Sequence, residues 1–149
     1  MTNTRQLIIG LFMAAISVAP MAANASEPRT AACSVSVTYL LNNVVRSTYV
    51  KDFVVSPGAP FSDDFSTVTR FRFFDASATL AADGKSTTVS INYYNDIGVF
   101  ESVDFDTELT LHDDKSPEST SGRHSYWSSL GVAGEHTTRY ELTCQLLKD

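Results

Sequence analysis

The sequence lacks the features that mark membrane proteins, nucleic-acid-binding proteins and helical proteins. After the N-terminal segment, no apolar run approaches the roughly 18–20 residues that a membrane-spanning helix needs. Basic residues are outnumbered, with 11 Lys and Arg against 17 Asp and Glu and a net charge of −6. Nucleic acid and anionic lipid surfaces are therefore poor candidates as partners. Helical periodicity is almost absent, so the chain is expected to consist of β-strands.

Catalytic motifs are missing as well. The chain contains no Gly-x-Ser-x-Gly elbow, no His-Glu-x-x-His pair and no glycine-rich phosphate-binding loop. His112, His124 and His136 are available as bases, but we interpret each as an ordinary surface or strand residue. The pairs Asp63-Asp64 and Asp113-Asp114 lie in turn-like contexts, where aspartate commonly binds its own backbone. We expect a protein that is not an enzyme and that uses neither a cofactor nor a bound metal.

The N-terminus has the pattern of a secretory signal peptide. Arg5 supplies a positive charge, residues 7–19 form an apolar run, and Ala23-Asn24-Ala25 is a small-x-small cleavage site. We therefore expect a signal peptide over residues 1–25 and a single β-domain over residues 26–149. The protein would then be periplasmic or secreted, without membrane insertion after cleavage.

Only two cysteines are present, and they occupy matching positions near the two ends of the mature chain. In the segment 137–147, apolar residues alternate with polar ones, which is the period of a strand with one buried face, and Cys144 is on the apolar side. The segment 33–41 has the same alternation, with Cys33 on its apolar side. We predict that the first and last strands pair and that a Cys33–Cys144 disulfide joins them, as exported proteins permit. The alternative is a pair of buried free thiols.

Turn signals divide the remaining chain into short strands. Asn42-Asn43 marks a hairpin, and the following strand, residues 44–55, is expected to turn Val45 inward. Turns at roughly ten-residue spacing are typical of sandwiches and small barrels. We predict an all-β fold, a small antiparallel β-sandwich or barrel of about seven to eight strands closed by one disulfide between the terminal strands.

Asp83-Gly84 is the strongest short-range signal, because glycine tolerates the positive φ of a two-residue hairpin loop. The loop sets a register with Leu80 opposite Thr87 and Phe74 opposite Tyr93, which keeps the apolar residues on one face.

The preceding segment has a different phase. Phe71 and Phe73 alternate there with Arg70 and Arg72, which places the phenylalanines in one phase and the arginines in the other. We therefore expect a bulge or break between Phe73 and Asp75.

The segment 113–122 is polar, contains Pro117 and is expected to be an exposed loop. It leads into a strand at residues 125–130, where Tyr126 and Trp127 have opposite phases, so that one ring is buried and the other lies near the surface. Loops on rigid scaffolds carry many binding residues, and aromatic anchors dominate contact energies. We therefore select the loop 115–124 with the two aromatic residues as the first candidate surface for a protein partner. Its candidate binding residues are Ser121, Gly122, Arg123, His124, Tyr126 and Trp127.

A second candidate surface is the acidic stripe Asp104, Asp106 and Glu108 on the outward face of one strand. Residues two apart on a strand are about 6.6–6.8 Å apart, so adjacent members of the stripe are poorly spaced to share one metal ion. One interpretation is a docking face for a basic protein. The other is a solvated strand face that resists aggregation, with Arg70 and Arg72 as pairing partners.

The residues Ser121-Gly122-Arg123-His124-Ser125-Tyr126 resemble the Ser-Gly-x-x-Tyr loop of periplasmic lysozyme inhibitors, which are small acidic β-barrels. The tyrosine stands one residue later here. The resemblance implies that Ser121 is a hydroxyl inserted into the cleft of a hydrolase, with Tyr126 as its support.

A third possibility is a pilus or fibre subunit whose sheet is completed by a strand of its neighbour. A disulfide between the chain's own terminal strands argues against this alternative. From the sequence we therefore predict an exported binding protein that engages a macromolecular partner. The lysozyme inhibitor and the fibre subunit remain as alternatives.

Overall fold

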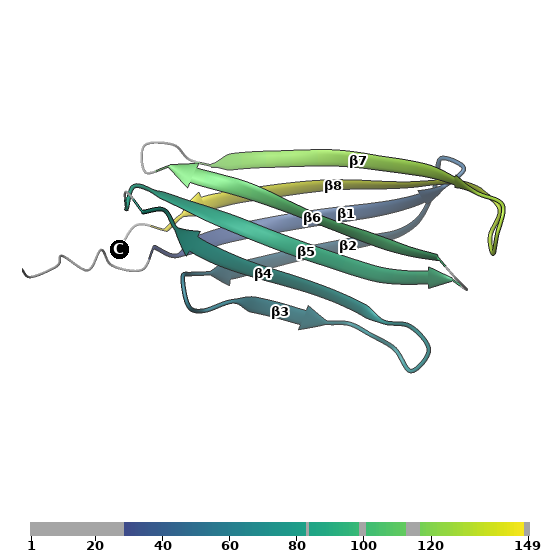
Figure 1. Cartoon of the computed structure of the whole chain (residues 1–149), viewed down its shortest axis with the longest axis horizontal. Helices are drawn as coiled ribbons and strands as arrows, with labels where there is room; N and C mark the ends of the chain where they lie inside the picture. Colours follow the sequence, from purple (N-terminus) through teal and green to yellow (C-terminus); the bar gives the residue numbers. More distant parts are fainter. Residues whose placement is uncertain (1–28, 83, 99–100, 113–116, 148–149) are drawn as a thin grey trace, which may run out of the picture.

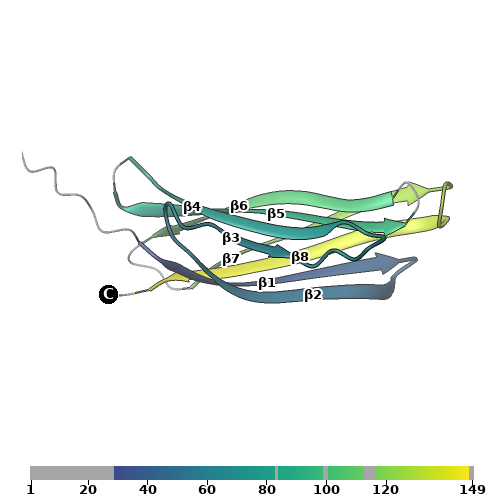
Figure 2. The same cartoon turned by 90° about the horizontal axis from the view of Figure 1, so that it is seen from below.

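Two antiparallel β-sheets pack face to face in this protein. The computed structural model describes residues 29–82, 84–98, 101–112 and 117–147, so the expected signal peptide lies outside the described residues. One sheet has the order β2-β1-β8-β7 and the other the order β3-β4-β5-β6 (Figures 1 and 2). The strands are β1 (Ala31–Leu41), β2 (Val44–Val55), β3 (Phe61–Asp64), β4 (Arg72–Leu80), β5 (Ser86–Gly98), β6 (Glu101–His112), β7 (Glu118–Ser128) and β8 (Gly134–Leu146).

The architecture is that of a sandwich and not of a closed barrel. Each sheet has its own two edge strands, β2 and β7 in one and β3 and β6 in the other. The predicted all-β fold of seven to eight strands is confirmed. Among the described residues, no helix is long and apolar enough to cross a membrane.

Inward-facing apolar residues of both sheets form the core. Phe74, Val35, Val89 and Leu142 are completely buried. Tyr93 and Phe105 stack with 5.4 Å between their ring centroids, and Phe105 stacks in turn on Tyr140 at 4.6 Å, which connects the two sheets. The alternation of apolar and polar residues predicted for the first and last strands is the pattern that fills this core.

The predicted pairing of the terminal strands is confirmed. β1 and β8 lie side by side and antiparallel, and Cys33 is directly opposite Cys144 in their register. A disulfide joins the two residues. This cross-link is of the kind found in oxidising compartments.

The turn at Asn42-Asn43 and the register of the β4–β5 hairpin are also confirmed, although β4 ends at Leu80 and β5 begins at Ser86, so that this connection is longer than the two residues predicted. Asn42 and Asn43 have φ values of 50° and 62°, which match a tight hairpin turn between β1 and β2. In the β4–β5 pair, Leu80 lies opposite Thr87 and Phe74 opposite Tyr93, as predicted. Asp83 itself lies outside the described residues.

The prediction of a bulge or break between Phe73 and Asp75 was wrong. β4 runs from Arg72 to Leu80 without a shift in its register with either neighbour. Phe74 faces the core, so Arg72 faces inward with it, while Phe73 faces outward and stacks on Tyr94 at 5.4 Å. The error arose because two alternating phenylalanines suggested a buried face, whereas the exposed Phe71 and the stacked Phe73 belong to the outer one.

Two further details differ from prediction. Val45 is exposed, because the β1–β2 register shifts between Tyr39 and Leu40 and thereby changes the face that the first residues of β2 present. The short edge strand β3 was not predicted, since its four residues are too few to show a clear period.

Candidate functional site

The first candidate surface is a strand and not a loop. Residues 118–122, predicted as part of an exposed loop, belong to β7, which pairs with β8 along its whole length. Hydroxyl pairs reinforce this pairing, with Ser119 Oγ 2.8 Å from Thr143 Oγ1 and Ser125 Oγ 2.8 Å from Thr137 Oγ1. As an edge strand, β7 leaves much of both faces to solvent, so its residues need no apolar alternation. Lys115 lies outside the described residues.

Strand geometry separates the predicted binding residues into two groups. Because successive side chains of a strand point to opposite faces, the six residues cannot form one surface. Ser121, Arg123 and Trp127 lie on the outer face of the sheet. Gly122, His124 and Tyr126 are on the other side, in the rows of Tyr140, Thr138 and His136.

Trp127 is the most prominent residue of the outer group. Its side chain is 73% exposed, which confirms the prediction that one of the two adjacent rings lies near the surface. It stands opposite Glu135, whose carboxylate is 3.8 Å from the Arg123 guanidinium. Arg123 Nε also donates a hydrogen bond to Ser125 Oγ at 3.3 Å. The outer face thus presents an exposed aromatic ring beside a charged pair.

Tyr126 is half-buried, because its ring covers His136. The two rings stack with 4.9 Å between centroids and an 8° interplanar angle. His136 is 1% exposed, so it is a strand residue, as one of the two interpretations had it, but one that is buried within β8. The signal that could have found it is its parity, since His136 continues the inward row of Tyr140 and Leu142.

Three further groups hold His136 in place. Its Nδ1 lies 2.8 Å from the Tyr39 hydroxyl and its Nε2 lies 2.8 Å from the Val132 carbonyl oxygen. Because a carbonyl only accepts, Nε2 donates to Val132, and in the neutral ring Nδ1 accepts from Tyr39. Burial raises the pKa of the Tyr39 hydroxyl, so this group stays a donor. The buried Glu101 carboxylate is 3.6 Å from Nε2.

Gly122 has a packing role. A Cβ atom at this position would lie 2.6 Å from Cζ of the Tyr140 ring, too close for any real contact. The ring fills the space that the glycine leaves, stacks on Phe105 and donates a hydrogen bond to Thr107 Oγ1 at 3.2 Å. The glycine of the Ser-Gly-x-x-Tyr resemblance therefore serves the contact between the sheets.

The acidic stripe lies on the outer face of the other sheet. Asp104, Asp106 and Glu108 are all exposed. They stand opposite Tyr94, Asn92 and Ser90 of β5, and Ser90 Oγ donates to Glu108 Oε1 at 3.1 Å. Since the stripe and Trp127 lie on opposite faces of the sandwich, one flat partner surface cannot contact both.

The structure shows which side chains surround this stripe. Arg70 and Arg72 do not pair with it, since both line a cavity between the sheets. Among the residues described, no group of three or more His, Cys, Asp or Glu side chains is placed to hold a metal ion.

One end of the sandwich collects exposed hydrophobic side chains. This end, the loop end, consists of the β1–β2 turn, the β3–β4 connection (65–71) and the β7–β8 connection (129–133), and Figure 1 shows all three on the side away from the C-terminus. Asn42 binds Glu135 through two hydrogen bonds and so joins the β1–β2 turn to the start of β8. Of the ten large hydrophobic side chains that the described residues expose, seven lie in these segments or at the adjoining ends of β2 and β7: Val44, Val45, Val68, Phe71, Trp127, Leu130 and Val132.

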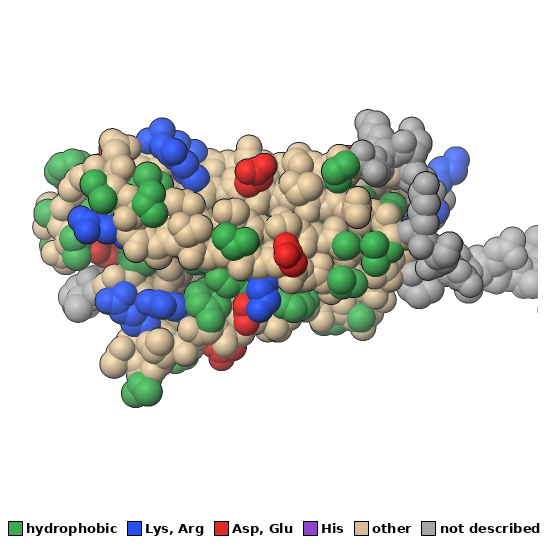
Figure 3. All heavy atoms as spheres, turned by 180° about the vertical axis from the view of Figure 1, so that it is seen from behind, with side chains coloured by type: hydrophobic (Ala, Val, Ile, Leu, Met, Phe, Trp, Pro, Cys, Tyr) green, Lys and Arg blue, Asp and Glu red, His purple; other side chains and the backbone are tan. Residues whose placement is uncertain are grey.

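The loop end is also rich in basic side chains. Seen from behind in Figure 3, hydrophobic and basic side chains lie side by side at this end. Apolar and aromatic groups next to arginine are the composition that protein–protein contacts favour. No single stretch of the chain signals this surface, because its residues come from separate connections and from the adjoining ends of β2 and β7.

Comparison of the chain with family models, with curated proteins and with solved structures finds no match.

Proposed function

We propose that this is an exported, non-enzymatic binding protein that engages a protein partner through the outer face of β7 and the adjoining loop end. The observation that carries the proposal is the 73% exposure of Trp127, near the end of β7, together with the exposed Leu130 and Val132 of the β7–β8 connection that follows it. A large aromatic ring left in water gains free energy when a partner covers it. Tryptophan and arginine are the residues that contribute most often to binding hot spots.

The immediate neighbours of Trp127 support a protein partner. Arg123 and Glu135 form a charged pair beside the ring, which suits the polar rim of an interface around an aromatic centre. The net charge of −6 attracts a basic partner over long range, while the basic side chains of the loop end would contact acidic groups on that partner's surface.

Export is supported by two independent features. Residues 1–25 have the charged, apolar and small-x-small regions of a signal peptide. The Cys33–Cys144 disulfide is stable in an oxidising compartment such as the periplasm or the exterior. Both fit a periplasmic or secreted protein.

The test begins with the immobilised protein in an envelope extract, followed by mass spectrometry of the bound fraction and purification of the partner so identified. Trp127→Ala should weaken that partner's affinity by at least about tenfold without shifting the midpoint of thermal unfolding. The matched control is Val50→Ala, which removes another exposed hydrophobic side chain from the middle of β2, away from the loop end. Unchanged affinity in Trp127→Ala would refute the proposal.

The same experiment separates the alternatives. A basic hydrolase in the bound fraction would favour the lysozyme-inhibitor alternative, although Ser121 lies within β7, opposite Glu141, and not in a protruding loop. Copies of the protein itself would favour a fibre subunit. The triple variant Asp104→Asn, Asp106→Asn, Glu108→Gln should leave affinity unchanged if the Trp127 face alone is used. A loss of affinity in this triple variant would instead indicate that the partner binds the acidic stripe.

A further inference from the structure

A cavity of about 530 Å³ opens between the two sheets near the loop end. It exists because the inward rows of three strands change from apolar to polar as they approach this end. The row of β4 continues from Phe74 to Arg72, that of β5 from Tyr93 to Asn95, and that of β2 from Tyr49 to Ser47. The polar side chains at this end do not interdigitate as the apolar side chains of the core do. A space of this size is typical of sites for small molecules.

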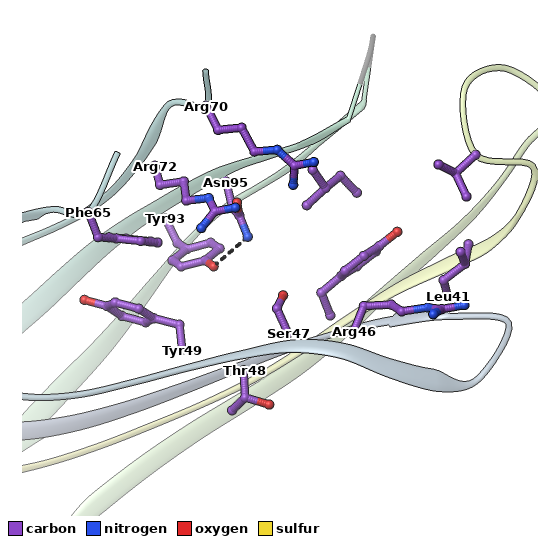
Figure 4. A pocket seen from close by; sticks show the side chains of 13 residues that line it. Leu41, Arg46, Ser47, Thr48, Tyr49, Phe65, Arg70, Arg72, Tyr93 and Asn95 are labelled. Atoms are coloured by element: carbon purple, nitrogen blue, oxygen red, sulfur yellow. Dashed lines mark hydrogen bonds between the residues drawn. The ribbon is translucent and has the colours of Figure 1, made fainter. Parts of the chain in front are cut away.

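Three arginines line this cavity. Arg72 of β4 and Arg70 of the β3–β4 connection reach into it from one side, across from Tyr49 and Ser47 of β2 (Figure 4). Arg46 lies at the β2 wall, with its head group turned toward Leu41. Among the described residues, no acidic side chain lines the cavity and none forms an ion pair with these arginines. Arg70 and Arg72, which extend into the cavity from the same side, have no counter-charge there, and an anion beside them would supply one.

Two buried polar atoms facing the cavity have no partner among the residues described. Asn95 is 5% exposed and its Nδ2 donates to the Tyr93 hydroxyl at 3.3 Å, but its Oδ1 accepts nothing. The Nε of Arg72 is buried without an acceptor. Burial raises the pKa of Tyr93, so its hydroxyl keeps a proton that it can donate. The wall therefore offers several donors and one acceptor, held in place by the packing of β4 and β5.

Aromatic rings form the inner wall. Tyr49 stacks on Phe65 with 4.7 Å between centroids, and Tyr93 lies 5.5 Å from Tyr49 and 6.1 Å from Phe65. Such a cluster provides a surface against which a flat or apolar group can pack.

We propose that this cavity binds a small organic anion. Its carboxylate, sulfonate or phosphate group would lie beside Arg70 and Arg72, and its flat apolar body would pack against the rings of Tyr49, Phe65 and Tyr93. A hydroxyl or amine of the ligand would donate to Asn95 Oδ1. Arginine suits this role because its planar fork binds such anions through two hydrogen bonds.

A fluorescence titration with two matched probes tests the proposal. 8-Anilinonaphthalene-1-sulfonate is a flat aromatic anion, and N-phenyl-1-naphthylamine has the same ring system without the sulfonate. The wild-type protein should bind the anionic probe at one saturable site, more tightly than the neutral one and more weakly as salt rises. Equal affinity for both probes, or indifference to salt, would overturn the proposal in favour of a merely apolar, water-filled cavity.

Variants then locate the site. Arg70→Gln, at an exposed position, should weaken binding of the anionic probe by about tenfold. Arg46→Gln, also exposed but with its head group turned toward Leu41, should weaken that binding less. Neither variant should affect binding of the neutral probe. Arg139→Gln, on the outer face of β8, is the matched control and should change nothing. Wild-type affinity in both cavity variants would overturn the proposal.

Trp127→Ala distinguishes the cavity from the protein-binding surface. This variant should bind the anionic probe as the wild type does. If it abolishes probe binding, the probe occupies the loop end and the cavity proposal is refuted, while the proposed protein interface remains to be judged by its own experiment.

Discussion

Cys33 and Cys144 face each other across β1 and β8, and their disulfide closes a loop of 111 residues. The cross-link restricts the unfolded chain, so removing it should lower the free energy of unfolding. On the chain-entropy model the loss is about 4–5 kcal/mol for the double variant Cys33→Ala, Cys144→Ala. Urea unfolding measures it.

Reductant supplies the control for this experiment. It should destabilise the wild-type protein and leave the double variant unchanged. A double variant with the same urea midpoint as the oxidised wild type would contradict the prediction.

Much of the fold could be predicted because its signals are local. The register of Leu80 with Thr87 follows from a glycine in a short loop and from one apolar face on each side. The disulfide follows from two cysteines on the apolar sides of the terminal strands. In both cases strand alternation alone decides which face a residue occupies.

The missed features depend on packing between sheets. β7 has no apolar alternation, because an edge strand leaves much of both faces to solvent, and its polar residues 118–122 therefore suggested a loop. Arg72 was assigned to the wrong face, because the outward pair Phe71 and Phe73 imitated a buried row. The cavity and the loop end combine residues from several strands and connections, and no short segment records that combination.

The hydrogen bond between Tyr39 and His136 yields the second prediction. Tyr39→Phe removes the donor 2.8 Å from Nδ1 and leaves a buried acceptor without a partner. The free energy of unfolding should fall by about 1–3 kcal/mol. Tyr126→Phe is the matched control, because its hydroxyl forms no hydrogen bond with a described residue while its ring still stacks on His136. Equal losses in the two variants would show that the hydroxyl of Tyr39 contributes nothing specific.

The contact between Gly122 and Tyr140 yields the third prediction. Gly122→Ala places a methyl group against the ring, and overpacking of this kind should lower the free energy of unfolding by about 1–3 kcal/mol. Ser121→Ala, at the neighbouring exposed position, should change it by no more than about 0.5 kcal/mol. Adding Tyr140→Leu to Gly122→Ala should recover part of the loss. A Gly122→Ala protein as stable as Ser121→Ala would refute the contact.

Asp63 yields a prediction about pH. Its carboxylate lies 3.0 Å from Lys51 Nζ and accepts a hydrogen bond from the Tyr49 hydroxyl at 2.9 Å. These two contacts, with Lys51 the larger cause, hold the pKa of Asp63 below its ordinary value of 3.8. A group whose pKa is lower in the folded state stabilises the fold above its unfolded pKa. That contribution disappears as the pH falls through the folded pKa.

Asp63→Asn should therefore lower the free energy of unfolding at pH 7 by about 1 kcal/mol, the range of a partly exposed ion pair. The difference from the wild type should shrink as the pH falls below about 4, because the wild-type carboxylate then becomes protonated. Urea unfolding at a series of pH values measures both the loss at pH 7 and its decrease at low pH. Asp52→Asn, one residue from Lys51 on the exposed side of β2, is the control and should show no such convergence. A deficit in Asp63→Asn that stays constant down to pH 2 would assign the loss to packing and not to charge.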